Sequence, residues 1–501
     1  MTRTEKFLKN TFATAILQIM TIISGFIIPK VMLVVFGSEI NGMVTSITQM
    51  ISYLTLLEAG LSGATIYALY KPLAYQDHYA INRILVAAKN FYYKTGYLFL
   101  IAIIICGIIY PYFISSSILE YWEIVTLFLI LGTNGILEFF TLAKYRALLT
   151  ADQKTYVISL ATIVQIILNI IIIVSLSFAG YSIVIVRLVA ILSIFIRTGI
   201  LWIYCKKKYC YLNFSVTPYY EAMDKRWDAL YLQILGVIHQ GAPILIATFL
   251  LSLKEVSVLA VYNLVILGVN ALLGIFISGL ASGFGDLIAR KEDVAFKNAF
   301  CEFEFIYYIL ITIIYSTLFF VYLPFIEVFT LGSDINYTYP VFTVLMIING
   351  LFYNLKNPFG MLVISAGKYK ETKVQTTIQG VLEIVCGIIL AYFYGLNGII
   401  IGCIISNLYR DIDFLFFAPR QLTHMSNTIT IRLWLLHLII FVGAGVLSTY
   451  IMIKVTDYFD WFIYAASVFL VATMIIVVID VILFRYLAKQ IFLRFKLILH
   501  R

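Results

Sequence analysis

Apolar stretches long enough to cross a bilayer recur along the whole chain and constrain its fold more than any other feature. The hydrocarbon core of a membrane takes about 20 apolar residues in a helix. A window of that length predicts fourteen spans, and backbone in lipid must satisfy its own hydrogen bonds, so each span should be helical. Their expected bounds are residues 10–36, 40–70, 90–113, 122–143, 156–179, 181–204, 228–252, 257–287, 299–324, 338–365, 373–394, 396–418, 432–453 and 461–484.

Composition excludes a soluble protein. The chain is 62% hydrophobic and 12% charged, whereas soluble domains are about 45–50% apolar and about 25% charged. The six cysteines form no CxxC pair and lie mostly inside apolar spans, which is typical of small hydrophobic residues rather than of a disulfide or metal framework. The sequence therefore predicts an all-α polytopic membrane protein without a metal site.

Basic residues indicate the orientation. If the N-terminus is cytoplasmic, the connections on that side hold 29 of the 35 Lys and Arg residues, and the opposite side holds only Lys254 and Lys454. This asymmetry follows the positive-inside rule and argues against nucleic-acid binding. We expect a multi-pass protein of the cell (cytoplasmic) membrane with both termini cytoplasmic.

Two pairs of similar segments predict an internal repeat. AGLSGATIYALYK (59–71) aligns with SGLASGFGDLIAR (278–290) at an offset of 219, and TADQKTYV (150–157) resembles SAGKYKETKV (365–374). The alternative is that small residues simply recur wherever membrane helices pack closely. The repeat interpretation predicts an N-terminal lobe of six helices (1–205), a cytoplasmic linker (206–227), a C-terminal lobe of six helices (228–418), and two additional helices with a basic tail (419–501).

The stretch LLEAGLSGATIYALYKPLAYQDHYAIN (56–82) resembles the Wzx-type polysaccharide flippases of the multidrug/oligosaccharidyl-lipid/polysaccharide exporter superfamily. Supporting stretches are FGSEINGM (36–43), KYRALLTADQKTYV (144–157), KEVSVLAVYNLVI (254–266) and SGLASGFGDLIARKE (278–292). The resemblance covers roughly the first 400 residues and rests on the order and spacing of these segments.

This resemblance implies a V-shaped, two-lobed bundle that moves undecaprenyl-pyrophosphate-linked oligosaccharide repeat units between leaflets by alternating access. It implies that Lys30 stands where relatives carry a basic residue and that Glu58 matches an acidic one. In the seventh span, Ala242 stands where relatives often have an aspartate, which removes one carboxylate suited to cation coupling. The implied protein is a monomer without a cofactor, energised by an H⁺ or Na⁺ gradient or by the membrane potential. Its implied partners are the lipid-linked oligosaccharide, membrane lipids, and the polymerase and glycosyltransferases of the same pathway.

Charged and polar residues within the spans are the candidate site residues, because a charge inside hydrocarbon costs roughly 2.5–3.5 kcal/mol and usually has a function. The cations expected to bind the substrate are Lys30, Arg187, Arg197 and Lys356. The carboxylates expected to pair with them or to couple transport to an ion are Glu58, Glu138 and Glu383. Side chains expected to line a cavity are His239, Gln240 and Asn354, and the small residues expected to permit gating are Gly60, Gly63, Gly279 and Gly283.

Each of these candidates has a structural alternative. Lys30, which follows Pro29 in FIIPKVMLVVF, and the arginines could extend to the membrane surface. Lys356 lies in INGLFYNLKNPFGM, whose asparagines and proline predict an interrupted helix. The carboxylates could be purely structural partners, and His239 could be a packing residue.

Two other functions share some of these features. A drug efflux transporter of the same superfamily would favour anionic sites for cationic drugs, whereas four cations lie within the spans here. A membrane-embedded glycosyltransferase or polymerase would need catalytic acids in a sizeable outer loop, and the connections are too short for one. No nucleophile–base pair or phosphate-binding loop is present in the sequence, so we expect a transporter and no catalytic residues.

Overall fold

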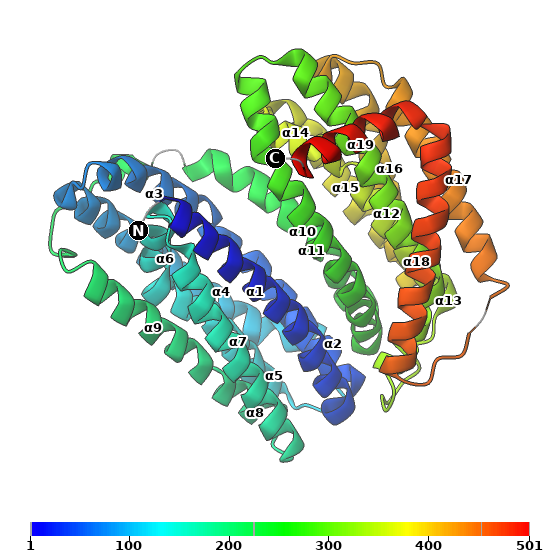
Figure 1. Ribbon diagram of the computed structural model, residues 1–501. Helices are drawn as coiled ribbons and strands as arrows, with labels where there is room; N and C mark the ends of the chain where they lie inside the picture. The colour runs from blue at the N-terminus through cyan, green and yellow to red at the C-terminus, as the bar shows by residue number, and fades with distance from the viewer. Residues whose placement is uncertain (1–2, 224–225, 452, 500–501) are drawn as a thin grey trace. The chain divides into compact units, whose positions relative to one another are not determined.

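The computed structural model describes residues 3–223, 226–451 and 453–499, and all regular structure in these ranges is helical (Figure 1). The all-α prediction is confirmed. The elements, with π and 3-10 segments marked η, are α1 Arg3–Val31, η1 Met32–Phe36, α2 Gly37–Leu54, α3 Leu56–Ala74, α4 His78–Phe113, α5 Tyr121–Leu137, η2 Glu138–Leu142, α6 Ala143–Ala151, α7 Thr155–Phe178, α8 Ile183–Ala190, α9 Leu192–Lys208, η3 Tyr220–Met223, α10 Arg226–Leu250, α11 Leu253–Ala289, α12 Asp293–Phe329, α13 Pro340–Leu355, α14 Asn357–Ser365, α15 Tyr369–Tyr394, α16 Leu396–Ala418, η4 Pro419–Thr423, α17 Thr428–Ser448, α18 Tyr458–Leu483 and α19 Arg485–Leu499.

Ten helical stretches of the described chain are long and apolar enough to cross a membrane. The chain is therefore a multi-pass membrane protein. The four predicted spans outside this set correspond to α3, α10, α13 with α14, and α16. One of these, α16, fails a purely apolar criterion because it carries Arg410, Asp411 and Asp413 within its last three turns.

The chain forms two compact units. Unit 1 contains Met1–Ala260 with Gly332–Ile335, and unit 2 contains Val261–Leu331 with Asn336–Arg501. In unit 1, α1 packs against α7, α4 against α3 and α5, and α10 against α2 and α3. In unit 2, α15 packs against α16, and α12 packs against α13, α17 and α18. The sequence-based division into two six-helix lobes follows the repeat rather than these contacts, and it remains a prediction.

The helices recur at a nearly constant spacing along the chain. The long helices α4 and α12 begin at His78 and Asp293, which are 215 residues apart, and they contain 36 and 37 residues. The next matching pair, α7 and α15, begins at Thr155 and Tyr369, which are 214 residues apart. The same spacing relates α2–α3 to α11 and α5–α6 to α13–α14. Two copies of one six-pass pattern therefore run from α1 to α9 and from α10 to α16.

The turns between these helices match in backbone detail. Gln153 and Gly367 both have positive φ, at 57° and 66°. In each turn the next residue, Lys154 or Lys368, donates its N–H to the carbonyl five residues earlier, at 2.8 and 3.0 Å. This is the hydrogen bond of a Schellman-type helix end, and it occurs at equivalent places in both copies.

A second pair of turns corrects the register of the repeat. Gln76 and Lys291 have φ values of 56° and 57° and are 215 residues apart. The offset of 219 inferred from AGLSGATIYALYK and SGLASGFGDLIAR is therefore wrong by four residues, about one helical turn. Small residues on a packed helix face recur every turn, so an alignment guided by them can slip by that amount.

Close helix contacts occur at glycines that the sequence analysis did not single out. A Cβ atom built on Gly42 in α2 would lie 1.8 Å from the carbonyl oxygen of Leu253, and one on Gly402 in α16 would lie 2.5 Å from the backbone nitrogen of Gly387 in α15. Next to the first contact, Asn41 donates a hydrogen bond to Ser257 at 2.7 Å. Only glycine permits backbones to approach this closely.

A charged cluster outside the spans holds three segments of unit 1 together. The Asp152 carboxylate lies 3.1 Å from the Lys6 ammonium at the start of α1 and 2.5 Å from that of Lys154, and it accepts a hydrogen bond from the Tyr209 hydroxyl at 2.6 Å. Burial alone raises the pKa of Asp152, but the hydrogen bonds from Lys154, Tyr209 and Lys6 outweigh that effect and leave the pKa below its ordinary value. The ionised carboxylate is therefore the form that stabilises the fold.

Replacing Asp152 with asparagine should lower the stability of the protein at neutral pH by about 1–3 kcal/mol, because charge-assisted hydrogen bonds are lost. Because the folded-state pKa is depressed, the stabilisation by Asp152 is complete above the unfolded value of about 4 and is lost as pH falls through the folded value. Thermal unfolding of the detergent-solubilised protein at pH 7 and under acid conditions measures both effects. The Asp77→Asn variant is a suitable control, since Asp77 is an exposed helix cap and asparagine caps equally well. Equal behaviour of the two variants would contradict this role.

Candidate transport site

Lys356 lies at an interruption between two helices of unit 2. It ends α13 and precedes α14, whose first turn contains Pro358. Proline has no N–H, so the carbonyl of Asn354 loses its usual helical donor. The Tyr307 hydroxyl of α12 donates to this carbonyl instead, at 3.2 Å. The interruption predicted from INGLFYNLKNPFGM is therefore present, and a tyrosine from a neighbouring helix satisfies it.

Asn354 is fully buried beside this interruption. Its side-chain amide donates to the Asn270 side chain at 2.8 Å and to the Tyr315 hydroxyl at 2.8 Å, and its side-chain carbonyl accepts from Asn357 at 2.8 Å. Since its amide and carbonyl are both engaged with protein groups, Asn354 orients the helix break in this structure.

The Lys356 ammonium belongs to a buried polar group that we call the Lys356 cluster: Lys356, Gln379, Glu383, Asn407 and Asp411. Lys356 donates a hydrogen bond to the Asn407 side chain, which also accepts from Gln379 at 3.3 Å. Glu383 and Asp411 are each 1% exposed and act electrostatically on Lys356. The cluster joins the α13–α14 interruption to α15 and α16.

Asp411 is the least satisfied member of the Lys356 cluster. Neither of its carboxylate oxygens makes a hydrogen bond within the described residues, and its charged neighbours are Lys356 and Arg410. Arg410 itself pairs with Asp413 at 2.5 Å and lies over the ring of Phe414. The sequence analysis did not include Asp411 or Arg410, although the adjacent opposite charges in NLYRDID, inside an apolar span, were a usable signal.

Unit 1 has a charged group at the equivalent helix interruption. The π segment η2 begins at Glu138, which binds Arg146 and lies 3.7 Å from the guanidinium of Arg197. Arg197 also donates to Gln165 at 3.2 Å. In this structure, then, the expected substrate cation Arg197 is an ion-pair partner of Glu138.

Arg187 differs from Arg197. It lies in α8, inside the apolar stretch Ile183–Lys208, and is partly buried where α8 packs against α5 and α7. Its Nε atom is buried and makes no hydrogen bond within the described residues, among which no carboxylate forms an ion pair with it. A guanidinium in this position has a binding capacity that the surrounding described chain does not use.

The remaining candidates are more dispersed. Lys30 is partly buried in the last turn of α1. In α10, His239 is partly buried and Gln240 is exposed. The side chain of Glu58, and position 60, lie outside the residues whose burial is described. The structure thus gathers Lys356, Glu383 and Asn354 in one region of unit 2, and Glu138 and Arg197 in one region of unit 1.

The glycines expected to act in gating are not packed against neighbouring helices. A Cβ atom built on each of three of them would meet no heavy atom within 4 Å: Gly63, Gly279 and Gly283. Their gating role remains a prediction, and the close contacts of this structure lie at Gly42 and Gly402 instead.

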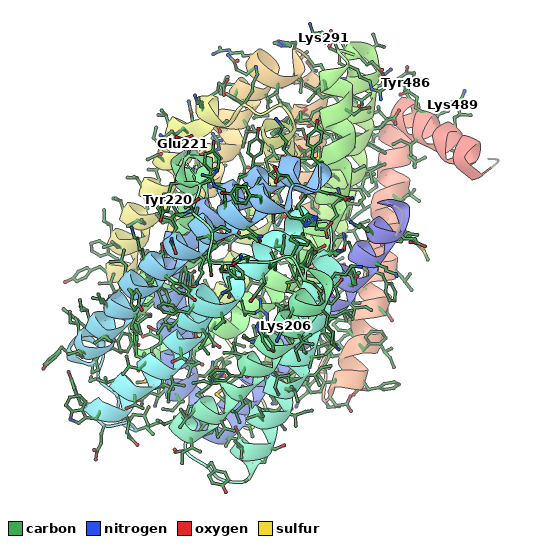
Figure 2. The ribbon with its side chains drawn as sticks, turned by 90° about the vertical axis from the view of Figure 1, so that its left-hand side faces the viewer. Lys206, Tyr220, Glu221, Lys291, Tyr486 and Lys489 are labelled. Atoms are coloured by element: carbon green, nitrogen blue, oxygen red, sulfur yellow. The ribbon has the colours of Figure 1, made fainter. Side chains whose placement is uncertain are left out.

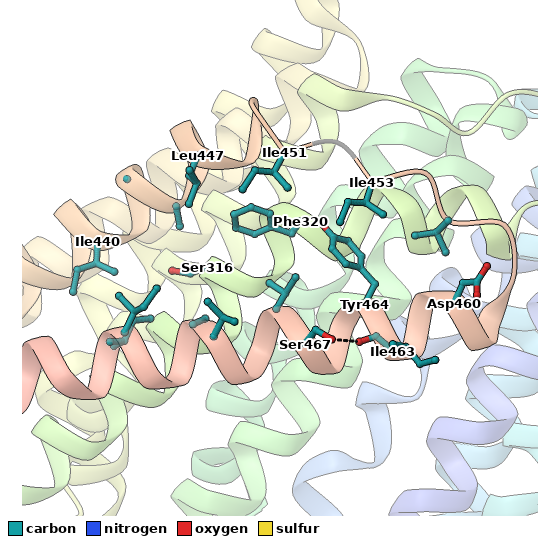
Figure 3. Close-up of a pocket in the computed structure, with 18 of the residues that line it drawn as sticks. Ser316, Phe320, Ile440, Leu447, Ile451, Ile453, Asp460, Ile463, Tyr464 and Ser467 are labelled. Atoms are coloured by element: carbon teal, nitrogen blue, oxygen red, sulfur yellow. Dashed lines mark hydrogen bonds between the residues drawn. The ribbon is translucent and has the colours of Figure 1, made fainter.

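An apolar pocket of about 830 Å³ lies in unit 2 between α12, α17 and α18 (Figure 3). Its walls are mainly aliphatic, with Phe320 and Tyr464 among them, and its few polar groups include Ser316, Lys454 and Asp460. Such a lining suits an apolar chain or ring better than a sugar.

A buried polar pair connects the two helices that form the walls of this pocket. His437 of α17 and Asp480 of α18 are 4% and 0% exposed, and their side chains approach to 3.7 Å. They make no hydrogen bond within the described residues. Sequence analysis placed Asp480 among the intramembrane acids but gave it no partner, because a contact between two helices separated by a loop cannot be read from spacing.

Solved transporter structures resemble the whole chain. The lipid II flippase MurJ, in an inward closed conformation, matches with a TM-score of 0.67 and 14% identity over 96% of this chain and 99% of MurJ. An inward-facing multidrug resistance MATE family transporter of the MOP superfamily matches with a TM-score of 0.64 and 15% identity over 82% of this chain and 94% of the transporter. The chain has the MOP transporter fold.

A third structure with this fold has a different binding pocket. It is a MOP superfamily transporter from Pyrococcus furiosus, described as having a pocket of reverse polarity that suggests a different function, and it matches with a TM-score of 0.53 and 15% identity over 83% of this chain and 93% of its own. No family model matches the sequence, and no curated protein matches it. At these identities the MOP fold is shared, and the substrate must be argued from the residues of this chain.

Proposed function

We propose that this protein is a flippase that moves undecaprenyl-pyrophosphate-linked oligosaccharide repeat units across the cytoplasmic membrane by alternating access, for surface polysaccharide biosynthesis. The observation that carries the proposal is Arg187, a guanidinium in an apolar span whose Nε has no partner within the described residues. Arginine binds phosphate oxygens in a bidentate manner, and a pyrophosphate crossing the membrane needs fixed positive charge to replace its hydration. Lys30 and Lys356 are the other proposed substrate cations.

The apolar pocket supports a substrate that has a lipid part. A polyprenyl chain is an unbranched succession of apolar units, and the aliphatic walls formed by α12, α17 and α18 suit a segment of such a chain. We assign the polymerase and glycosyltransferases of the pathway as functional partners, and we place both termini in the cytoplasm. The Lys356 cluster, with Glu383 and Asp411, is the proposed place where an H⁺ or Na⁺ gradient, or the membrane potential, acts on the transport cycle.

Drug efflux is the second candidate, because one of the structures with this fold is a multidrug transporter and the apolar pocket could also hold a drug. The two functions differ in the charge of the substrate. Arg187 and Lys30 favour an anion, whereas a site for cationic drugs would favour carboxylates. An enzymatic function is disfavoured, since the described connections between helices leave no room for a catalytic domain.

A reconstitution assay tests the proposal. Purified protein in liposomes should flip a fluorescent undecaprenyl-pyrophosphate-linked oligosaccharide, measured as accessibility to a membrane-impermeant quencher. Liposomes without protein give the background rate, and a cationic dye tests the second candidate in the same vesicles. Transport of the dye without flipping of the pyrophosphate-linked lipid would refute the flippase proposal.

A further inference from the structure

The C-terminal segment expected as a basic tail forms a helix, α19, directly after the membrane span α18. Phe484 interrupts the helical path with φ −116° and ψ 46°, and its ring packs 5.9 Å from that of Phe305 in α12. Only this one residue separates Leu483, the last residue of α18, from Arg485, the first of α19. The start of α19 is therefore fixed within a turn of the end of a span, which places it at the level of a membrane–water interface.

One face of α19 packs against the protein. Leu487 is 9% exposed, and α19 contacts α18 and α12. At 3.6 residues per turn, the opposite face carries Arg485, Lys489, Phe492 and Leu493. The two basic residues are exposed, and so are the two apolar ones, Phe492 at 69% and Leu493 at 49%. Figure 2 shows α19 at an angle to α18, with Lys489 pointing away from the helix.

An exposed face that combines cations with large apolar groups is suited to one environment. Water alone would leave Phe492 and Leu493 unburied, and the hydrocarbon core would leave Arg485 and Lys489 without hydration. At the headgroup level both needs are met, because the apolar side chains enter the acyl boundary and the cations contact phosphates. Tyr486, which is 73% exposed, is a residue type typical of that level.

We infer that α19 is an interfacial helix whose exposed face binds the headgroups of anionic membrane lipids. Charge decides the partner, since the face carries two cations, and neither Arg494 nor Lys496, which follow in the sequence, changes the sign. A basic helix beside a span gains about 1 kcal/mol per cation from an anionic leaflet. The inference concerns lipids of the bilayer rather than the transported substrate, and it does not depend on the proposed function.

Hydrogen exchange of α19 in the full-length protein tests this inference. We expect the amides of α19 to exchange on the order of tenfold more slowly in nanodiscs that contain phosphatidylglycerol than in nanodiscs of phosphatidylcholine alone. High salt should reduce the difference, because it screens the headgroup charge. Identical exchange in the two bilayers would overturn the inference, and so would full protection in detergent, which would show that protein contacts alone hold the helix.

Variants separate the contributions of charge and apolar surface. The double variant Arg485→Gln/Lys489→Gln should lose the difference between the two bilayers, whereas Phe492→Ser/Leu493→Ser should exchange faster in both. The matched control is Lys206→Gln/Lys207→Gln, which removes two exposed cations from α9 and should leave the exchange of α19 unchanged. If the control variant lowers the lipid dependence as much as the α19 charge variant, the binding is not local to α19 and the inference fails.

Discussion

Replacing Arg187 with glutamate should abolish export of surface polysaccharide while leaving the protein in the membrane. Arg187 provides a guanidinium whose Nε is unused within the described chain, and a carboxylate in its place would repel a pyrophosphate. Arg187→Gln should reduce export by about 10- to 100-fold, the effect of losing one charge-assisted hydrogen bond of about 1.5–3 kcal/mol. Arg187→Lys should fall between the two, because lysine keeps the charge but not the bidentate geometry. Surface polysaccharide at matched protein levels measures all three.

Two controls make the Arg187 series interpretable. Arg290→Gln removes an exposed arginine that pairs with Asp286 at 3.0 Å, and such surface pairs contribute little, so export should stay close to wild type. Arg197→Gln breaks the pair with Glu138 and should lower the amount of folded protein rather than transport by the protein that remains. Wild-type export by Arg187→Glu would remove Arg187 from the site and with it the main support for an anionic substrate.

Replacing Gly42 with alanine should strongly destabilise unit 1. The new methyl group would lie 1.8 Å from the carbonyl oxygen of Leu253, so α2 and the start of α11 would have to move apart. Overpacking of this kind costs about 1–3 kcal/mol, and more when the obstructing atom belongs to the backbone. The separation should also break the buried hydrogen bond from Asn41 to Ser257. We expect a lower unfolding temperature in detergent and less monodisperse protein on size-exclusion chromatography.

The matched controls for Gly42 are Gly63→Ala and Gly279→Ala. A Cβ atom at either position meets no heavy atom within 4 Å, and alanine favours helix over glycine by about 1 kcal/mol, so these variants should be as stable as wild type or more so. Equal destabilisation by all three substitutions would show that the close approach at Gly42 has no special importance.

Much of the fold was predictable because lipid imposes a simple rule on sequence. The apolar spans, their helical structure and the repeat all follow from periodic features that each segment carries by itself. The interruption at Lys356 was predictable for the same reason, since Pro358 acts on its own helix. Arg187 was recognisable as a charge in an apolar stretch, although its lack of a partner within the described residues required coordinates.

Contacts between distant segments were not predictable. The cluster at Asp152 joins residues up to 146 positions apart, and nothing in the local sequence of Lys6 indicates this partner. The closest backbone contact involves Gly42, whereas the sequence drew attention to Gly279 because it lies in a row of small residues. A small residue shows where a helix could be approached, and only the packing of the other helices decides where the approach occurs.

The matching turns near residues 76 and 291, and near 153 and 367, have a consequence for the ancestry of the chain. Six helical passes are an even number, so a unit of this kind begins and ends on the same side of the membrane. Two such units can be fused head to tail through a short segment, like the one between Lys208 and Arg226, without inserting another crossing. The backbone is therefore what a gene duplication of a self-associating six-pass ancestor would leave. After fusion each copy could change alone, which accounts for a glutamate at one helix interruption and a lysine at the other.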